Sequence, residues 1–80
     1  MLVLEIITPE KKLFTGAIKI VKLPGTMGSF EIMENHAAII STLGKGTVRV
    51  KELNGTVSNF EIEGGLVEMS DNEVKVLVEM

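Results

Sequence analysis

The chain has 80 residues and a formal net charge of −3 at pH 7, so it is too short for several domains and lacks the basic surface that nucleic-acid binding requires. It contains no cysteine, which excludes a disulfide framework and a thiolate zinc site. No apolar run reaches the roughly 18 residues needed to span a bilayer, and the first residues lack the basic start of a signal peptide, so we expect a soluble, cytoplasmic chain.

The hydrophobic residues are mostly Val, Ile, Leu and Met, with three Phe and no Trp or Tyr. Enrichment in β-branched residues favours strands. Turn-forming residues recur about every 8 to 12 positions, which is the spacing of an all-β sandwich or barrel. We therefore predict one domain over residues 1–80, a small flattened antiparallel β-sandwich or barrel of about eight to ten short strands.

Gly and Pro divide the first half of the chain into five predicted strands. Pro9 ends the first strand because proline cannot donate to a ladder, and Gly16 breaks the second strand from the third. Pro24-Gly25 predicts a type II turn, since Pro fixes φ and Gly supplies a positive φ. The fifth segment is apolar on both faces, which predicts that it is covered on both sides. The five strands are Leu2–Thr8, Lys11–Phe14, Ala17–Leu23, Ser29–Ile32 and His36–Ser41.

The second half of the chain has the clearest alternation. In Thr47–Lys51 the valines alternate with polar residues and are predicted to face the core. Asn54-Gly55 then predicts a two-residue type I′ hairpin turn, and Phe60 and Ile62 alternate with polar residues on the returning strand.

A last hairpin is predicted between Leu66–Met69 and Glu73–Glu79, closed by Asp71-Asn72. The valines of its second strand share one face; they are Val74, Val76 and Val78. No amphipathic helix longer than two turns is predicted.

An ordered set of short motifs runs through these elements from Leu2 to Val78. The motifs are Thr8-Pro9-Glu10, Leu23-Pro24-Gly25, Gly28 with Phe30 and Ile32, His36-Ala37, Leu43 to Gly46, and Gly64-Gly65. No single motif is diagnostic, but the ordered set is specific. In this order and spacing the sequence resembles the epsilon subunit of the bacterial F-type rotary ATP synthase.

The resemblance implies a non-catalytic central-stalk (rotor) subunit that binds no cofactor. It would link the gamma subunit to the membrane c-ring, and through gamma to the catalytic alpha/beta head, in support of proton-driven ATP synthesis. It would lie peripherally on the cytoplasmic side of the bacterial inner membrane, without direct membrane insertion. Most epsilon subunits continue into a C-terminal helical hairpin that inhibits ATP hydrolysis. This sequence ends at Met80, so the resemblance implies neither that inhibition nor ATP binding here.

The resemblance also implies two sets of interface residues. The gamma-facing set is Thr8, His36 and Ser41, and the c-ring-facing set is Ser29, Phe30 and Glu31. Family members often have an acidic residue where this chain has Ser29, Gly where it has Glu31, and Pro-Gly where it has Glu34-Asn35. We expect Phe30 and Glu31 to be partly exposed, whereas Ile32 points either into the core or towards a partner.

The residues themselves give little support to a catalytic, metal-binding or phosphate-binding site. His36 is the only histidine, and catalysis or metal binding would need a positioned carboxylate or further ligands. Gly25 and Gly28 favour a tight turn over a phosphate loop, because a strand rather than a helix follows them. Gly64-Gly65 indicates a bulge or a close backbone approach.

Two other classes of protein remain as alternatives. A stand-alone small-molecule-binding β-barrel would need an internal cavity with convergent polar groups, but the inward Val, Ile and Leu residues predict a filled core. A small enzyme would need an acid/base pair, and none is evident in the sequence.

Overall fold

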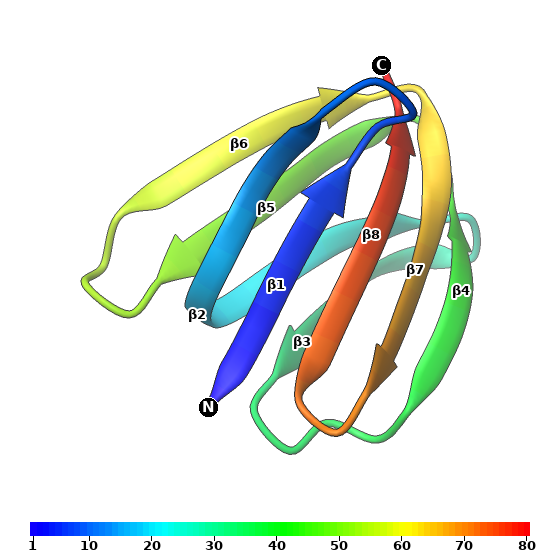
Figure 1. Cartoon of the computed structure of the whole chain (residues 1–80). Helices are drawn as coiled ribbons and strands as arrows, with labels where there is room; N and C mark the ends of the chain where they lie inside the picture. Colours follow the sequence, from blue (N-terminus) through cyan, green and yellow to red (C-terminus); the bar gives the residue numbers. More distant parts are fainter.

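The computed structural model describes residues 1–80 as eight β-strands without a helix (Figure 1). The all-β prediction and the predicted number of strands are confirmed. No segment forms a helix that is long and apolar enough to cross a membrane. The strands are β1 (Leu2–Ile7), β2 (Lys12–Gly25), β3 (Gly28–Met33), β4 (Ile39–Leu43), β5 (Gly46–Glu52), β6 (Val57–Ile62), β7 (Gly64–Ser70) and β8 (Glu73–Glu79).

The strands form two layers that share β2. The front layer of Figure 1 has the order β1-β8-β7-β4, and the back layer has the order β3-β2-β5-β6. The first half of β2 pairs with β1, and its second half pairs with β3 and β5. One pairing departs from the predicted antiparallel arrangement, because β1 and β8 run parallel. This pairing places β1 between β2 and β8, so neither of its edges is free.

The long strand β2 replaces the two short strands predicted over Lys11–Phe14 and Ala17–Leu23. Gly16 does not break it: the residue has a φ of +156°, which glycine adopts without steric cost, and its ladder with Leu4 is intact. The register shifts between Ile18 and Ile20, where β2 leaves β1 and joins β5. The strand therefore passes from one layer to the other after Gly16, at this register shift.

The predicted type II turn at Pro24-Gly25 is wrong. β2 continues through Gly25, which pairs with Gly28, and the chain turns at Thr26 and Met27. Gly28, with a φ of +124°, is the glycine that needs the positive φ. Gly25 is needed for space, because a Cβ there would lie 2.6 Å from the carbonyl oxygen of Gly28 and 2.9 Å from the ring of Phe30.

The two predicted hairpin turns have different outcomes. Asp71 and Asn72 have φ values of +50° and +61° between the paired Ser70 and Glu73, so this is a two-residue type I′ hairpin. At Asn54-Gly55 only the glycine has a positive φ, so the predicted type I′ turn is wrong.

Hydrogen bonds define the turn that forms at Asn54-Gly55 instead. The amide of Gly55 donates to the carbonyl of Glu52 at 2.9 Å, and the amide of Glu52 donates to the carbonyl of Thr56 at 2.9 Å. This pattern is that of a three-residue loop, a type I turn followed by a left-handed residue.

The segment His36–Ser41 is only partly a strand. β4 begins at Ile39, and Ile40 on its outer side is 72% exposed, so within this chain the predicted cover on both sides is absent. The reason lies in the topology, because nothing in the chain packs on the solvent side of the front layer.

The core between the layers consists of 16 buried side chains, and none of them is polar. The predicted inward valines of β5 and β8 are all buried, and so is Ile32, which settles its orientation. Phe14 and Phe60 meet edge to face at the rim, with ring centroids 6.5 Å apart. The buried side chains are Leu2, Leu4, Ile6, Ile18, Val21, Leu23, Ile32, Leu43, Val48, Val50, Ile62, Val67, Met69, Val74, Val76 and Val78.

The prediction of a close backbone approach at Gly64-Gly65 holds for the second glycine, and it can be tested. A Cβ on Gly65 would overlap the carbonyl oxygen of Leu77, whereas a Cβ on Gly64 would meet its nearest atom at 3.5 Å. We expect Gly65→Ala to lower the free energy of unfolding by about 1–3 kcal/mol, as overpacking does, and Gly64→Ala to change it much less. Urea denaturation of both variants measures this; equal midpoints would contradict the strand packing.

Candidate functional site

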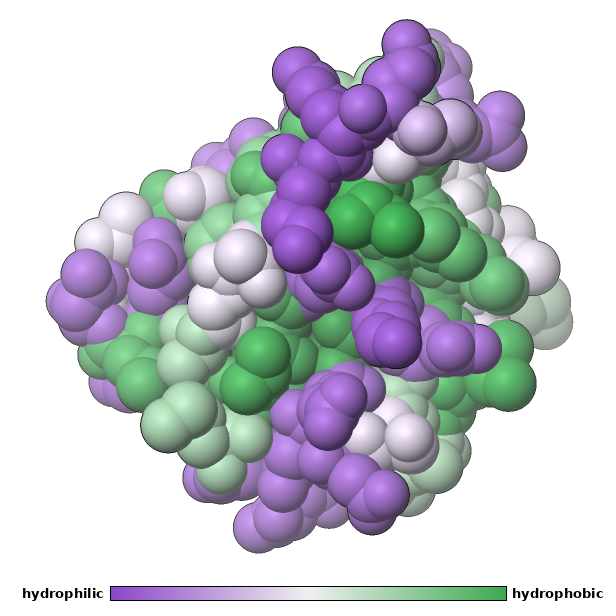
Figure 2. Space-filling model, in the orientation of Figure 1, coloured by the Kyte–Doolittle hydropathy of each residue, from purple (hydrophilic) through white to green (hydrophobic).

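The solvent-facing surface of the front layer, here called the outer face, carries a continuous row of apolar side chains. Leu77 on β8 pairs directly with Ile7 on β1 and with Leu66 on β7. Leu77 is 48% exposed, and the other two are half-buried. Figure 2 shows this face, with hydrophobic surface over β7 and β8 between hydrophilic side chains. Contiguous exposed apolar surface of this kind is typical of interaction sites.

A second row crosses all four strands of the front layer and is mostly charged. It lies two residues along each strand from the apolar row. It runs from Glu5 through Lys75 and Glu68 to Ile40, again through direct cross-strand pairs. Glu5 is paired with Lys12 of β2 at 3.1 Å. The outer face therefore combines an apolar row with a charged row that ends in an exposed isoleucine.

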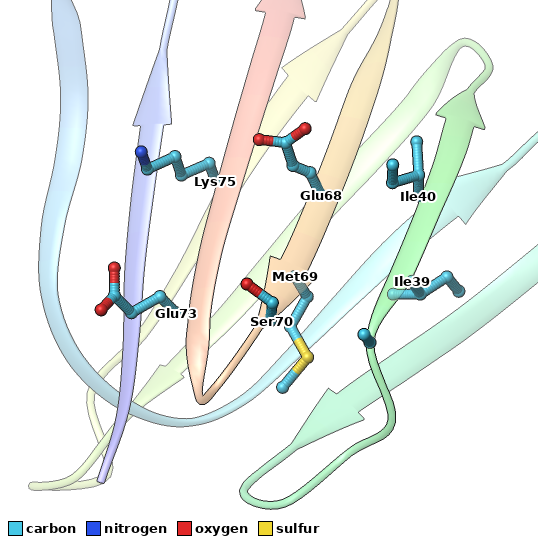
Figure 3. Close-up of a pocket in the computed structure, with 8 residues that line it drawn as sticks. Ile39, Ile40, Glu68, Met69, Ser70, Glu73 and Lys75 are labelled. Carbon is cyan, nitrogen blue, oxygen red and sulfur yellow. The ribbon is translucent and has the colours of Figure 1, made fainter.

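Two shallow grooves lie on this face. The first groove follows the apolar row; its lining is Ile7, Thr8, Pro9, Gly65, Leu66, Leu77, Val78 and Glu79. The second groove lies over β4, β7 and the start of β8 (Figure 3); its lining is Ala38, Ile39, Ile40, Glu68, Met69, Ser70, Glu73 and Lys75.

Thr8 lines the first groove and also closes a turn. It follows β1 and is half-buried, and its Oγ1 accepts hydrogen bonds from the amides of Glu10 at 3.2 Å and Lys11 at 3.0 Å. These bonds satisfy backbone donors in the loop that contains Pro9. The hydroxyl of Thr8 therefore has a local structural role in addition to its position on the outer face.

His36 lies in the β3–β4 loop, at the opposite end of the outer face from Thr8 (Figure 1). It is half-buried, and its Nδ1 lies 2.7 Å from the carbonyl oxygen of Ala37. Because a carbonyl only accepts, Nδ1 carries the proton in this contact. No group of three or more His, Cys, Asp or Glu side chains is placed to hold a metal ion.

Ser41 does not project from the outer face. It pairs with the buried Val67, so its side chain faces the core side, and its Oγ donates to the carbonyl of Thr42 at 3.2 Å. The neighbouring Ile40 and Thr42 face outwards instead. Of the three predicted gamma-facing residues, Thr8 and His36 thus lie at the two ends of the outer face and Ser41 faces away from it, so they form no cluster.

The β3–β4 loop is held by a pair of asparagines that the sequence analysis missed. The Oδ1 of Asn72 accepts from the amide of Asn35 at 2.7 Å, and its Nδ2 donates to the Oδ1 of Asn35 at 3.3 Å. The carbonyl of Asn72 also accepts from the amide of Val3 at 2.9 Å. The N-terminal ammonium of Met1 pairs with Glu34 at 2.5 Å. The two asparagines are 37 positions apart in sequence, and no local pattern indicates their contact.

The predicted c-ring-facing residues lie on β3, in the other layer. Ser29 and Glu31 are exposed, and Phe30 is half-buried against the core, so the expected partial exposure of Phe30 and Glu31 is confirmed. Met27 at the tip of the β2–β3 hairpin is fully exposed, and the sequence analysis did not single it out.

The tip of this hairpin is tied to the front layer. The hydroxyls of Thr26 and Thr42 lie 2.8 Å apart, and the amide of Thr26 donates to the carbonyl of Thr42 at 3.2 Å. The amide of Gly44 donates to the carbonyl of Pro24 at 2.8 Å. The hairpin therefore has a fixed position relative to β4.

Solved structures contain the same fold. A chain of the Euglena gracilis mitochondrial ATP synthase, in a structure of its OSCP/F1/c-ring, superposes with a TM-score of 0.92 at 15% identity, over 99% of this chain and 51% of that chain. A chain of the Tetrahymena thermophila mitochondrial ATP synthase, in a structure of its central stalk and c-ring, gives 0.82 at 19% identity, over 99% and 63%. At these identities the likeness establishes the β-sandwich class.

The sequence establishes the family. All of residues 1–80 match the model of the ATP synthase Delta/Epsilon chain, beta-sandwich domain, and the chain belongs to this family. It is 40% identical over 76 residues to an ATP synthase epsilon chain of Chlorobium limicola, covering 95% of this chain and 86% of that protein. It is 36% identical over 75 residues to that of Leptospira borgpetersenii serovar Hardjo-bovis, covering 94% and 58%. The chain spans less than two thirds of the length of several curated relatives, between 55% and 59% of it.

Whether the asparagine pair holds the loop can be tested by removing the side chain of Asn72 while its backbone conformation is kept. Asn72→Gly keeps the positive φ and removes both side-chain hydrogen bonds to Asn35. We expect hydrogen exchange at the Asn35 amide to become about tenfold faster, which corresponds to the loss of about one hydrogen bond. Asp71→Gly is the matched control, because Asp71 has a positive φ in the same turn but makes no side-chain bond to the loop. Unchanged Asn35 exchange in Asn72→Gly would show that the pair does not hold the loop.

Proposed function

We propose that residues 1–80 form the β-sandwich domain of a non-catalytic rotor subunit of an F-type ATP synthase, and that the domain links the gamma subunit to the c-ring. The observation that carries this proposal is the match of the entire chain to the ATP synthase delta/epsilon β-sandwich, together with relatives named as epsilon chains. Rotation driven by proton flow would reach the catalytic alpha/beta head through gamma. The chain itself would be peripheral, on the cytoplasmic side of a bacterial inner membrane.

The outer face is the surface that we assign to gamma. Thr8 and His36 lie at its two ends, the apolar row of Ile7, Leu66 and Leu77 crosses its middle, and Ile40 projects from its margin. Covering a side chain such as Ile40, which is 72% exposed, contributes about 1–2 kcal/mol by removing apolar area from water. Ser41 then supports the interface through the position of β4 rather than by direct contact.

The β2–β3 hairpin is the surface that we assign to the c-ring. Ser29 and Glu31 are exposed on β3, Phe30 is half-exposed, and Met27 extends the hairpin tip. This hairpin belongs to the back layer, so the domain can contact gamma and the ring simultaneously. Because Thr26 is tied to Thr42, force applied at the hairpin reaches the front layer directly.

The assignment to gamma predicts stable association. The chain should co-purify with its cognate gamma subunit, and His36→Glu should weaken that association at least about tenfold, because it places a carboxylate in a half-buried interface position. Asn59→Glu, at an exposed position of β6 in the back layer, adds the same charge and should bind as the unmodified chain does. Both variants should melt within a few degrees of the unmodified chain. Failure of the unmodified chain to bind gamma would overturn the proposal.

The assignment to the c-ring predicts two different responses. Phe30→Ala should lower the affinity for a purified complex of gamma and c-ring more than Glu31→Gln does, since it removes apolar contact area. It should also lower domain stability by about 1–2 kcal/mol, because part of the ring packs on the core. The effect of Glu31→Gln should fade at high salt, as expected for a rim charge. If neither variant changes binding to the ring, this surface is misassigned.

A further inference from the structure

The second groove of the outer face holds a carboxylate without an ion-pair partner beside an exposed apolar side chain. Glu68 on β7 is exposed and pairs across the ladder with Ile40 on one side and Lys75 on the other. The ion pairs of the chain are Met1 with Glu34, Lys12 with Glu5 and Lys45 with Glu63. None of them includes Glu68, although a lysine stands directly opposite it.

The orientation of the side chains accounts for this. Figure 3 shows the Lys75 side chain extended over β1, on the side away from Glu68. The Ile40 side chain stands on the other flank of Glu68. Glu73 adds a second carboxylate to the groove, so its charged lining is two carboxylates and one ammonium. The groove therefore offers an acidic group next to an apolar wall.

We propose that this groove receives a lysine or arginine side chain from the partner that covers the outer face. The inference rests on the proposed function, in which that partner is the gamma subunit. The methylene stem of the basic side chain would pack on Ile40, and its charged head would donate hydrogen bonds to the carboxylate of Glu68. A partner that covered the apolar row and brought no cation would desolvate this carboxylate at a cost.

The two halves of this contact respond differently to salt. The carboxylate lies on an open surface until the partner binds, so the attraction that brings a cation to it is screened as ionic strength rises. The packing on Ile40 is apolar and is not screened. A basic partner side chain therefore predicts a salt-sensitive contribution from Glu68 and a salt-insensitive contribution from Ile40, within the same interface.

Binding of the whole chain to its cognate gamma subunit tests the proposal. At low salt, near about 50 mM, Glu68→Gln should weaken binding about threefold to tenfold, and Glu68→Lys by more than about tenfold. Both losses should shrink severalfold at about 500 mM salt, whereas the loss from Ile40→Ala should persist. Glu61→Lys, an equal charge change at an exposed position of β6, is the control and should bind as the unmodified chain does. Melting curves check that each variant is folded.

The outcomes separate this inference from the function on which it rests. If the unmodified chain does not bind gamma, both are overturned. If it binds gamma and Glu68→Lys binds equally well at low salt, the basic side chain is ruled out and the rotor function stands. If Glu68→Lys weakens binding equally at low and high salt, the position is in contact but faces no cation, and the inference fails.

Discussion

The backbone pairing of β2 is the constraint on which the rest of the structure depends. This single strand hydrogen-bonds to β1, β3 and β5 and meets β4 at Gly25, so it belongs to both layers. The register shift between Ile18 and Ile20 marks the point where it passes from one layer into the other. Because the same strand ends in the β2–β3 hairpin, the positions of the outer face and of the hairpin are both tied to this one strand.

Because the chain is small, the apolar side chains that remain on its outer face indicate what that face does. A domain of 80 residues buries only a modest share of its surface, and its apolar residues are needed inside. Here 16 apolar side chains fill the interior without a polar group, so the interior lacks the convergent polar atoms that a ligand cavity needs. Further apolar side chains nevertheless remain on the outer face, where Leu77 and Ile40 are exposed. An interface to another protein accounts for them better than an internal site does.

Strand alternation and one hairpin were predictable from the sequence because they are local properties. Val74, Val76 and Val78 are inward, and Asp71-Asn72 forms the two-residue turn between β7 and β8. The chain breaks predicted at Gly16 and Pro24-Gly25 are absent, because turn propensity at these positions is overridden by the strand pairing of β2. The contact of Asn35 with Asn72 and the inward orientation of Ser41 depend on pairings between distant strands, which motif order does not reveal.

The parallel pairing of β1 with β8 has a consequence for how the chain acquires its structure. Within the sandwich β1 is made first, but one of its two partners, β8, is made last. The front layer therefore cannot close until β8 is available, and β1 is left with an open edge until then. Bringing β1 and β8 together closes a long loop, and the chain loses conformational entropy before the contacts between these strands stabilise it. Proteins dominated by such non-local pairings fold in about milliseconds to seconds rather than microseconds. During that interval the open edge of β1, with its leucine and isoleucine side chains, can pair with other chains.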